Sequence, residues 1–214
     1  MENSQKTNQY YSYKRPEMLG FIPSGVKKVL DVGCGEGSFS LSVKNKFNAE
    51  VWGIEINPKA AEIAQKNIDK VLVGDAIKII NDIPNSYFDC IVFNDVLEHM
   101  IDPYTVLEKM KTKLTNEGVI VCSIPNVRHI SVLKKLFIDG QWTYEDAGIL
   151  DKTHLRFFTK KSIIDMFEKL GYQIVKIEGI NQTNWWKSFL IDLMTLGLAT
   201  DIKYTQFACV VKPK

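Results

Sequence analysis

The sequence predicts an α/β protein with a mostly parallel, doubly wound sheet that carries helices on both faces. Short apolar runs alternate with helix-like segments along the whole chain. The runs are continuous rather than alternating in polarity, which is typical of strands buried on both faces of a sheet. Three glycines directly follow the first run, as in the tight strand-to-helix turn that opens such folds.

Seven of the apolar runs are expected strands. In chain order they cover residues 27–32, 50–56, 71–75, 88–95, 118–124, 172–179 and 206–212. Helices are expected between them at residues 38–47, 58–69, 104–114 and 162–170. Pro58 suits the first turn of its helix, and Gly171 suits the end of another, because proline fits the start of a helix and glycine its end. Such an alternation predicts parallel strands joined by helical crossovers.

The bulk properties limit the classes of function. A chain of 214 residues fits a single domain, here residues 1–214, and its net charge of +2 gives no electrostatic case for nucleic acid. Four cysteines without a C-x-x-C pair indicate a reducing compartment, so we expect a cytoplasmic protein. The polar N-terminus does not resemble a signal peptide, and we expect no integral membrane segment.

The stretch VLDVGCGEGSF contains Gly33, Gly35 and Gly37 at alternate positions. Glycine allows tight turns and lets a ligand approach the backbone closely, so ligand binding is a better interpretation than a plain turn. The spacing G-x-G-x-G differs from the dinucleotide fingerprint G-x-G-x-x-G, and no phosphate-binding P-loop motif is present.

Acidic residues end the next two expected strands, Glu55 after the second and Asp75 after the third. A carboxylate in the place of Glu55 can accept hydrogen bonds from both hydroxyls of a ribose. No basic groups that would suit a pyrophosphate accompany these acids. The predicted ligand therefore has a ribose and a purine-like ring but no phosphate chain. The alternative for both acids is helix capping or a solvated loop end.

Five motifs, VLDVGCGEG, WGIEINP, LVGDA, FDCIVFNDVLEH and LTNEGVIVCSIPN, follow one another in the order found in one family. Over roughly residues 10–180 and the closing strand, the chain resembles the class I S-adenosylmethionine-dependent methyltransferases. The resemblance implies a Rossmann-like fold. The segments RPEMLGFIP, SIPNVRH and LDKTHLRFFT further resemble a bacterial branch of this family that is associated with sugar and cell-surface glycan biosynthesis.

The resemblance also implies roles for individual residues. Those near the methionine part of the cofactor would be Asp31, Gly33 and Gly35, with Gly37 in the same loop. Those near the adenosine would be Glu55 on the ribose, Ile56 and Ala76 at the adenine ring, and Asp75 on its amino group. Asn94 would offer backbone contacts to the amino group of the cofactor. S-adenosylmethionine would leave as S-adenosylhomocysteine.

The three histidines, His99, His129 and His154, are the candidates for a general base. A sulfonium methyl is already activated, so the protein mainly aligns the reacting atoms, but a neutral hydroxyl acceptor benefits from a base. His154 is preferred because LDKTHLRFF precedes a helix in an expected lid. Insertions at residues 126–165 and 180–205 would form this acceptor side, and residues 1–25 an N-terminal cap.

Asp95, Glu98 and His99 form D-x-x-E-H, which resembles the divalent-cation motif E-x-x-E-H of the quinone O-methyltransferases. Oxygen and imidazole ligands could hold Mg²⁺ or a transition metal. The preferred interpretation is that Glu98 and His99 only shape the pocket. The expectation is therefore a reaction that requires no metal.

Several polar residues have weaker assignments. Arg15 could pair with the cofactor carboxylate, beside the tyrosines at 10, 11 and 13, and the alternative is a mobile tail. Arg128, Arg156 and Asn126 could bind an anionic acceptor such as a sugar phosphate, and the alternative for the arginines is an ordinary ion pair. The apolar segment 184–199 fits the core or a homodimer contact better than a membrane-surface anchor.

The leading hypothesis is an S-adenosylmethionine-dependent methyltransferase that acts on oxygen of a sugar, a nucleotide-sugar or a related small metabolite. Two enzyme alternatives are a quinone or lipid O-methyltransferase and an N-methyltransferase of an amino sugar. The alternative of another class is a regulatory module that binds the cofactor without catalysis.

Overall fold

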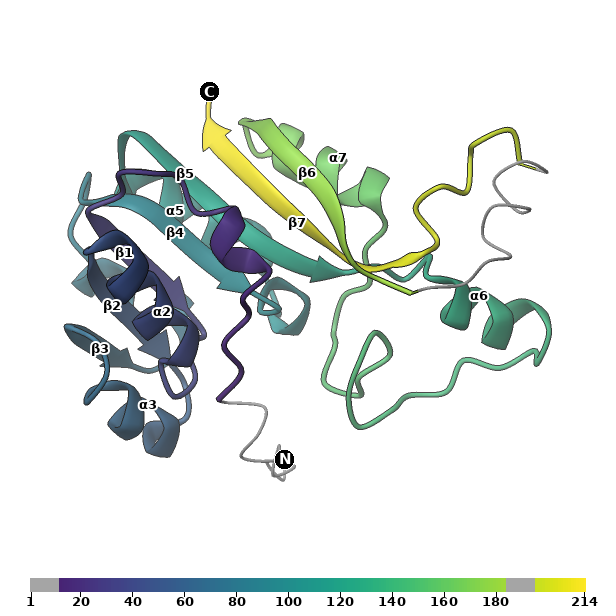
Figure 1. The fold of residues 1–214 in the computed structure, drawn as a ribbon, viewed down its shortest axis with the longest axis horizontal. Coiled ribbons are helices and arrows are strands. Elements are labelled where there is room, and N and C mark those ends of the chain that lie inside the picture. The colour runs from purple at the N-terminus through teal and green to yellow at the C-terminus, as the bar shows by residue number, and fades with distance from the viewer. Residues whose placement is uncertain (1–11, 184–194) are drawn as a thin grey trace.

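The computed structural model describes residues 12–183 and 195–214, which form one seven-stranded sheet with the strand order β3-β2-β1-β4-β5-β7-β6. Parallel pairing joins β1 to β2 and β4, β2 to β3, and β4 to β5. Only β7 runs antiparallel to its neighbours β5 and β6. Figure 1 shows this twisted sheet from β3 at one edge to the β6–β7 pair at the other. The predicted fold class is confirmed.

The strands are β1 (Lys28–Val32), β2 (Glu50–Glu55), β3 (Lys70–Val73), β4 (Phe88–Asn94), β5 (Leu114–Pro125), β6 (Tyr172–Gln182) and β7 (Tyr204–Pro213). The helices are α2 (Ser38–Phe47), α3 (Pro58–Ala64), α4 (Ala76–Ile79), α5 (Pro103–Met110), α6 (Ile130–Phe137) and α7 (Lys160–Lys169). Each expected strand and helix is present. The helix expected over 58–69 ends early, because Asp69 instead accepts a hydrogen bond from the Val51 amide of β2.

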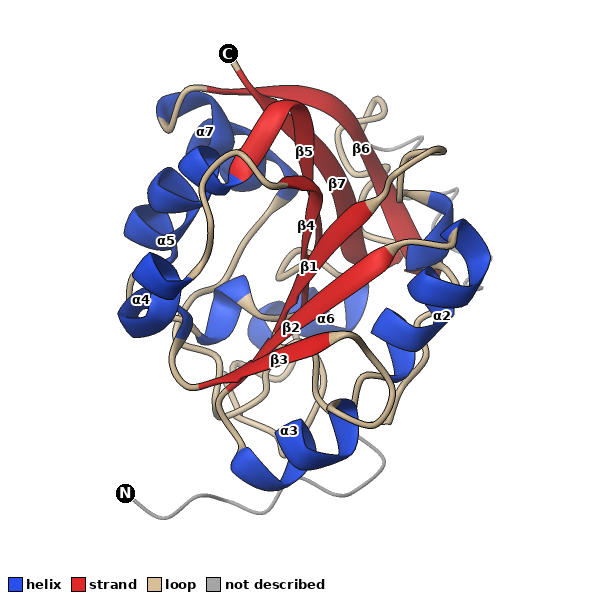
Figure 2. Cartoon of the chain, turned by 90° about the vertical axis from the view of Figure 1, so that its left-hand side faces the viewer, coloured by secondary structure: helices blue, strands red, loops and turns tan. Residues whose placement is uncertain are grey.

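Two apolar layers cover the two faces of the sheet (Figure 2). On one face α4, α5 and α7 pack through residues such as Leu107 and Phe167, which are fully buried. On the other face α2 and the N-terminal segment pack through Phe39, Val43 and Met18. Successive residues of β4, such as Ile91 and Val92, belong to opposite layers, because side chains alternate across a strand. This explains the continuous apolar runs.

The order of the strands reverses direction at β1, which lies between β2 and β4. In open parallel sheets ligands bind beyond the carboxyl ends of the strands at such a switch point. The loop after β1, Glu55 at the end of β2 and Asn94 at the end of β4 all lie at this edge. The topology therefore brings together the residues that the motifs single out.

Beyond the end of β5 the chain forms a separate lobe that contains α6 (Figure 1). Residues 126–159 and 195–203 meet in it, since Asn126 Nδ2 donates to the carbonyl of Asp201 and Ile130 N donates to the carbonyl of Ile202. This lobe contains much of the expected acceptor-side insertions at 126–165 and 180–205. Most of the apolar segment 184–199, including residues 184–194, lies outside the described residues.

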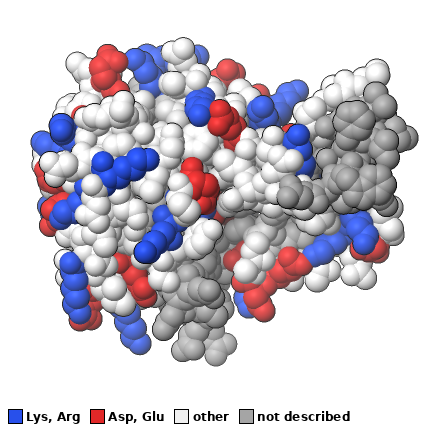
Figure 3. Space-filling view, in the orientation of Figure 1, with Lys and Arg blue, Asp and Glu red and all other residues white. Residues whose placement is uncertain are grey.

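Two surface properties bear on the expected partners. On the face shown in Figure 3, basic and acidic side chains are interspersed over the described residues. Within residues 12–183 and 195–214, none of the helices combines the length and the apolar character that a membrane span needs. All four cysteines, Cys34, Cys90, Cys122 and Cys209, are buried and free.

Candidate functional site

The glycine loop after β1 takes a conformation that side chains rarely adopt. Gly33, Gly35 and Gly37 have φ angles of +76°, +56° and +78°. A Cβ on Gly33 would lie 2.6 Å from Cγ2 of Val96. Glycine is required here both by the backbone angle and by the space, and the turn exposes backbone at the sheet edge where a ligand is expected.

Glu55 is buried against this loop and organises it. Its Oε2 accepts a hydrogen bond from the Gly35 amide at 2.8 Å, and its Oε1 accepts one from the Asn57 amide at 2.8 Å. The cap of α3 is Asn57, whose side chain accepts from the Lys59 amide, so Glu55 is not the helix cap. A carboxylate has about four acceptor positions, so Glu55 retains capacity for hydroxyl donors.

Asp31, on β1, lies buried beneath the loop and accepts a hydrogen bond from the Ser40 hydroxyl. Burial raises the pKa of Asp31 to about 7, and the nearby Glu55 carboxylate adds to the rise, while Ser40 and Arg15 oppose it. A carboxyl that is costly to ionise favours a cationic partner. The glycine-loop site, which we define as Asp31, residues 33–37 and Glu55, therefore suits a ligand with both hydroxyl and cationic groups.

The residues expected at the adenine lie along the same edge. Ile56 is 70 % exposed beside the loop, so its side chain offers an apolar face to a ring. Asp75 caps α4, because its Oδ1 accepts from the Ile77 amide at 3.1 Å, and Ala76 is buried behind it. Asp75 therefore has the capping role that the sequence offers as its alternative. Capping occupies one carboxylate oxygen and leaves the other as the atom that could accept from an amino group.

Asn94 is the last residue of β4, and Asp95 follows it and lines a pocket. Both polar atoms of the Asn94 side-chain amide are buried, and neither has a hydrogen-bond partner among the described residues. Buried polar groups normally find partners, so this amide marks a position for a polar ligand. Asp95 adopts a φ of +53° and accepts hydrogen bonds from Ser123 Oγ at 2.7 Å and from Gln206 Nε2 at 2.6 Å.

Arg15 reaches the same place from the N-terminal segment. Its guanidinium forms an ion pair with Asp95 and donates to Ser123 Oγ at 3.3 Å. Tyr13 stacks near it, with 5.6 Å between the Arg15 Cζ and the ring centroid, whereas the tyrosines at 10 and 11 lie outside the described residues. The structure thus gives Arg15 an internal partner, Asp95, in the place of the expected cofactor carboxylate.

A pocket of about 490 Å³ opens next to Asp95. Its lining comes from the ends of β4 and β5, from α6 and from the loop before α7. The lining residues are Asp95, Glu98, His99, Pro125, His129, Ser131, Val132, Lys135, Glu145, Ala147, Gly148, Ile149, Leu150, Asp151, His154, Thr205 and Gln206. All three histidines of the chain belong to it.

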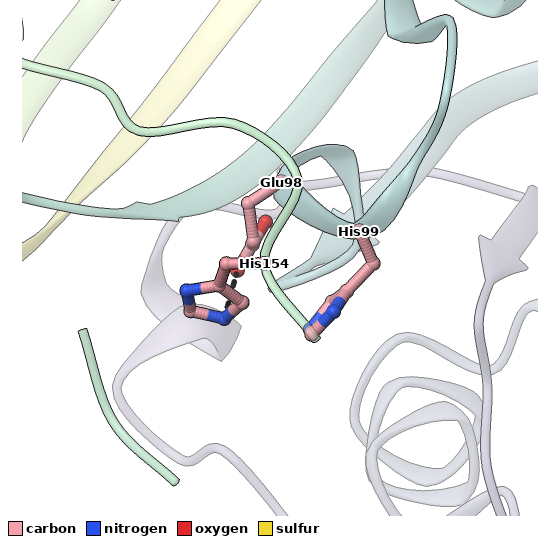
Figure 4. Close-up of side chains that lie close together, drawn as sticks. All are labelled: Glu98, His99 and His154. Carbon is pink, nitrogen blue, oxygen red and sulfur yellow. Dashed lines mark ion pairs between the residues drawn. The ribbon is translucent and has the colours of Figure 1, made fainter. Parts of the chain in front are cut away.

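Two of these histidines form a cluster with a buried carboxylate, which we call the histidine cluster: Glu98, His99 and His154 (Figure 4). One donor atom from each side chain lies within 4.8 Å of the others. Oε1 of Glu98 lies 3.9 Å from Nε2 of His154, and the centroids of the His99 and His154 rings are 4.6 Å apart. The D-x-x-E-H motif is therefore split: Asp95 binds Arg15, while His154 joins Glu98 and His99.

A short turn explains how residues so distant in sequence meet. The Asp151 carboxylate accepts from both the amide and the hydroxyl of Thr153, at 2.7 Å each, which folds the DKTH stretch. The amides of Leu155 and Arg156 then both donate to the carbonyl of Glu98, at 2.8 and 3.1 Å. These bonds attach the turn to the 3₁₀ helix Leu97–His99.

The turn also fixes the imidazoles. Nδ1 of His154 lies 3.0 Å from the carbonyl of Ile149, and Nδ1 of His99 lies 3.1 Å from the carbonyl of Thr153. A carbonyl only accepts, so in each ring Nδ1 carries the hydrogen and Nε2 is the basic nitrogen of the neutral form. The arrangement presents two basic nitrogens and one carboxylate to a pocket.

His129 lines the pocket but has a structural role. Its Nδ1 caps α6 by accepting from the Ser131 amide, and its Nε2 lies 2.9 Å from the Thr183 hydroxyl. Burial lowers the pKa of His129, which favours the neutral ring. Both nitrogens are engaged, so His129 is the least suited of the three histidines to act as a base.

The residues expected to bind an anionic acceptor lie outside the pocket lining and have internal partners. Arg128 forms an ion pair with Asp201, with 2.9 Å between Nη1 and Oδ1, and Arg156 donates to the Ile101 carbonyl. Asn126 is fully buried and its Nδ2 donates to the carbonyl groups of Asp201 and Tyr204. These contacts favour the structural alternative. The sequence carried no signal for Gln206 or Ser123, which reach Asp95 through strand pairing.

Comparison with known proteins adds a family to this geometry. Residues 5–177 match the family described as "Methyltransferase domain". A ubiquinone biosynthesis O-methyltransferase of Cereibacter sphaeroides is 25% identical over 193 residues, which are 86% of this chain and 76% of that protein. An uncharacterized protein of Methanocaldococcus jannaschii is 29% identical over 160 residues, 72% of this chain and 68% of its own.

A solved structure of similar fold is that of a SAM-dependent methyltransferase from Archaeoglobus fulgidus. It superimposes with a TM-score of 0.73 at 21% sequence identity, over 96% of this chain and 94% of that protein. At this identity the likeness concerns the fold, and it extends over the whole sheet.

Proposed function

Because this chain belongs to the methyltransferase domain family and is an S-adenosylmethionine-dependent methyltransferase, we propose that it methylates a hydroxyl oxygen of a small polar acceptor, of the sugar or nucleotide-sugar class. The observation that carries the proposal is the histidine cluster. It places basic nitrogens in a pocket that is lined by both polar and apolar groups, next to the glycine-loop site.

The residues at the sheet edge fit the cofactor. S-adenosylmethionine supplies a methyl group that is already activated on a positively charged sulfur. The glycine loop would cradle it with the backbone that Gly33, Gly35 and Gly37 expose through their positive φ angles, and Glu55 would accept from the ribose. Asp31 would face cationic charge, and the Asn94 amide, which has no partner within residues 12–183 and 195–214, would gain one.

The pocket supports a polar acceptor. Polar and charged residues outnumber apolar ones in its lining, and Ser131, Thr205 and Gln206 lie beside the histidine cluster, although apolar atoms provide the larger part of the pocket surface. Side chains that both donate and accept hydrogen bonds suit an acceptor with several hydroxyls, because each unpaired polar group in a pocket lowers the affinity for an apolar molecule. The acidic groups Asp95 and Glu145 are ion-paired to Arg15 and Lys135, so neither prevents a neutral sugar from entering.

The chain's own residues then assist the transfer. The acceptor oxygen forms a bond to the methyl carbon as the carbon–sulfur bond breaks, and the electron pair of that bond remains on sulfur. The proton of the hydroxyl must leave, and in the simplest mechanism Nε2 of His154 takes it, since its Nδ1–H is held by Ile149. Alignment of the three atoms contributes the larger part of the rate.

A second candidate acceptor is a phenol of the quinone type. Two observations favour it: the similarity to ubiquinone biosynthesis O-methyltransferases, and an aromatic group beside the pocket. Trp142 packs edge-on against Phe157 with 5.2 Å between ring centroids, and Tyr144 lies 6.3 Å from the same ring. Phe157 in turn lies 6.2 Å from His154. An amino sugar that accepts the methyl on nitrogen is a further outcome that the experiment separates.

The experiment is a methyl-transfer screen read by mass spectrometry, with sugars, nucleotide-sugars, amino sugars and catechols as acceptors. We expect a mass gain of one methyl on an oxygen of a sugar-type acceptor. Methylation of catechols alone would replace the sugar class by the phenol class. Calorimetry with S-adenosylhomocysteine, NAD and ATP gives the complementary test. Tight NAD binding without binding of the sulfur cofactor would contradict the site, and binding without any turnover would favour a regulatory module.

A further inference from the structure

We propose that Glu98, His99 and His154 bind a divalent transition-metal ion, and that the acceptor hydroxyl is a further ligand of this ion. The proposal rests on the proposed function for the place of the acceptor. It departs from the sequence-based expectation of a site without metal. The reason is a side chain that the D-x-x-E-H motif does not contain, His154, which the fold brings to Glu98 and His99.

The separations of the donor atoms fit a shared ion. Metal–nitrogen and metal–oxygen bonds are about 2.0–2.2 Å long, so two ligands of one ion lie about 3–4 Å apart. The 3.9 Å between Glu98 Oε1 and His154 Nε2 is too long for a hydrogen bond but within this range. The donor atoms of all three side chains lie within 4.8 Å of one another. Small side-chain rotations are enough to close the remaining distance.

The protonation and support of the imidazoles match those of metal ligands. A ligating histidine donates its second ring N–H to a carbonyl or a carboxylate, which fixes the tautomer and the ring orientation. His154 has this arrangement through the Ile149 carbonyl, and His99 has it through the carbonyl and hydroxyl of Thr153. The Thr153 hydroxyl in turn donates to Asp151, so the Asp151 carboxylate is linked to His99 through Thr153.

The ligand set indicates the kind of ion and its use. Two imidazoles and one carboxylate suit Zn²⁺, Co²⁺, Mn²⁺ or Fe²⁺ better than Mg²⁺ or Ca²⁺, which prefer oxygen ligands. Three protein ligands leave positions open, and here they face a pocket of about 490 Å³. An ion at this place would bind the acceptor oxygen and favour loss of its proton to water. His154 would then act as a ligand rather than as the base.

The test uses Co²⁺ as a probe on chelator-treated protein and follows its visible absorption and binding heat. We expect one Co²⁺ per chain, competition by Zn²⁺, and weaker binding below pH about 6, where free imidazoles are protonated. His154→Ala, His99→Ala and Glu98→Gln should each weaken binding by about 100-fold or more. The control is His129→Asn, which keeps a capping side chain on α6 and should bind Co²⁺ like the wild type.

Binding of S-adenosylhomocysteine to every variant shows that the fold and the glycine-loop site are intact. Absence of the Co²⁺ absorption in wild-type protein that still binds S-adenosylhomocysteine would overturn the proposal, and so would Co²⁺ binding that survives the His99 and His154 substitutions. Methyl transfer at full rate in excess chelator would overturn the role of the ion while the proposed function stands. If Co²⁺ binds but none of the hydroxyl acceptors changes its spectrum, the result would support a metal site and contradict O-methylation.

Discussion

The glycine-loop site and the histidine cluster lie at the same edge of the sheet, but they are assembled from different kinds of contact. The first consists of Asp31 in β1, the loop that directly follows β1, and Glu55 at the end of β2. Backbone amides hold it together, since the amide of Gly35 donates to Glu55, twenty positions away. The second joins residues 98–99 to residues 151–156 through a turn whose amides donate to the Glu98 carbonyl. The proposed cofactor site is thus part of the core sheet, whereas the proposed acceptor site depends on an added lobe.

The difference predicts that substitutions can affect one site without the other. A substitution of His154 should change the rate and leave cofactor affinity intact, and a substitution in the glycine-loop site should do the opposite. Four experiments test this separation, in order of the expected effect.

The largest effect is expected for His154→Ala. Removing the imidazole should slow methyl transfer by about 10²–10⁴-fold, whether His154 takes the proton or holds an ion. The affinity for S-adenosylhomocysteine should remain nearly that of the wild type, because His154 contacts Ile149 and Glu98 rather than the glycine loop. Single-turnover rates at saturating cofactor and calorimetry measure the two quantities.

His99→Ala is the matched comparison, since His99 lies nearer to the end of β4 and should lower both rate and affinity. A wild-type rate in His154→Ala would transfer the role of base to His99 or His129, or leave alignment alone as the source of catalysis.

The second effect concerns pH and Asp31. Burial, with a smaller contribution from Glu55, raises the pKa of Asp31 to about 7 in the folded protein. Between pH about 4 and pH about 7 the folded state therefore binds a proton that the unfolded chain has lost, and stability falls as pH rises, by up to about 4 kcal/mol over the window. Thermal melts of the cofactor-free protein and of Asp31→Asn measure this.

As pH rises through this window, the free energy of unfolding of Asp31→Asn should increase relative to that of the wild type. A difference in stability between the two proteins that stays constant from pH 4.5 to 8, within about 0.5 kcal/mol, would show that Asp31 is not perturbed.

The third effect is expected for Glu55→Ala. Loss of charge-assisted hydrogen bonds to the ribose should cost about 1.5–3 kcal/mol per bond removed, at most, so the affinity for S-adenosylhomocysteine should fall about 10- to 150-fold. The rate at saturating cofactor should change less. Glu55→Gln keeps the shape of the side chain and one acceptor oxygen, so its affinity for S-adenosylhomocysteine should lie between those of the wild type and Glu55→Ala. Unchanged affinity in Glu55→Ala would place the ribose elsewhere.

The smallest effect is expected for Arg128→Ala. The ion pair of Arg128 with Asp201 is partly exposed, and such pairs contribute about 1 kcal/mol or less to stability. The KM for the acceptor should not change, because Arg128 lies outside the pocket lining. A large rise in the KM for an anionic acceptor, with unchanged stability, would restore Arg128 as a substrate ligand.

The sequence was sufficient for the fold and for the arrangement of the glycine-loop site. Strands read as apolar runs because both faces of the sheet are covered, and the acidic ends of β1 and β2 meet the loop through parallel register. Local signals settle these features. The length of the helix after Pro58 was less predictable, because Asp69 can either continue a helix or bind the edge of β2, and only tertiary contact decides.

The histidine cluster could not be predicted from the sequence as it stands. Only the less favoured alternative for D-x-x-E-H, a metal site, grouped Asp95 with Glu98 and His99, and in the structure Arg15, eighty positions earlier, pairs with Asp95. His154 was singled out by its place in the chain, while its contact with Glu98 depends on the turn at Asp151. Likewise Arg128 and Asn126 read as polar groups near a strand end, and only the return of the chain at Asp201 gives them internal partners.

The turn that ends at Arg156 has a consequence for how this protein can diversify. Residues 136–148 are exposed throughout, whereas the chain is fixed on either side, by α6 before it and by the amides of Leu155 and Arg156 after it. Exposed connections tolerate insertions and new sequences at little thermodynamic cost. Random libraries or grafted loops confined to residues 138–144 would change the chain between Lys135 and Glu145, which both line the pocket, while the histidine cluster keeps its position.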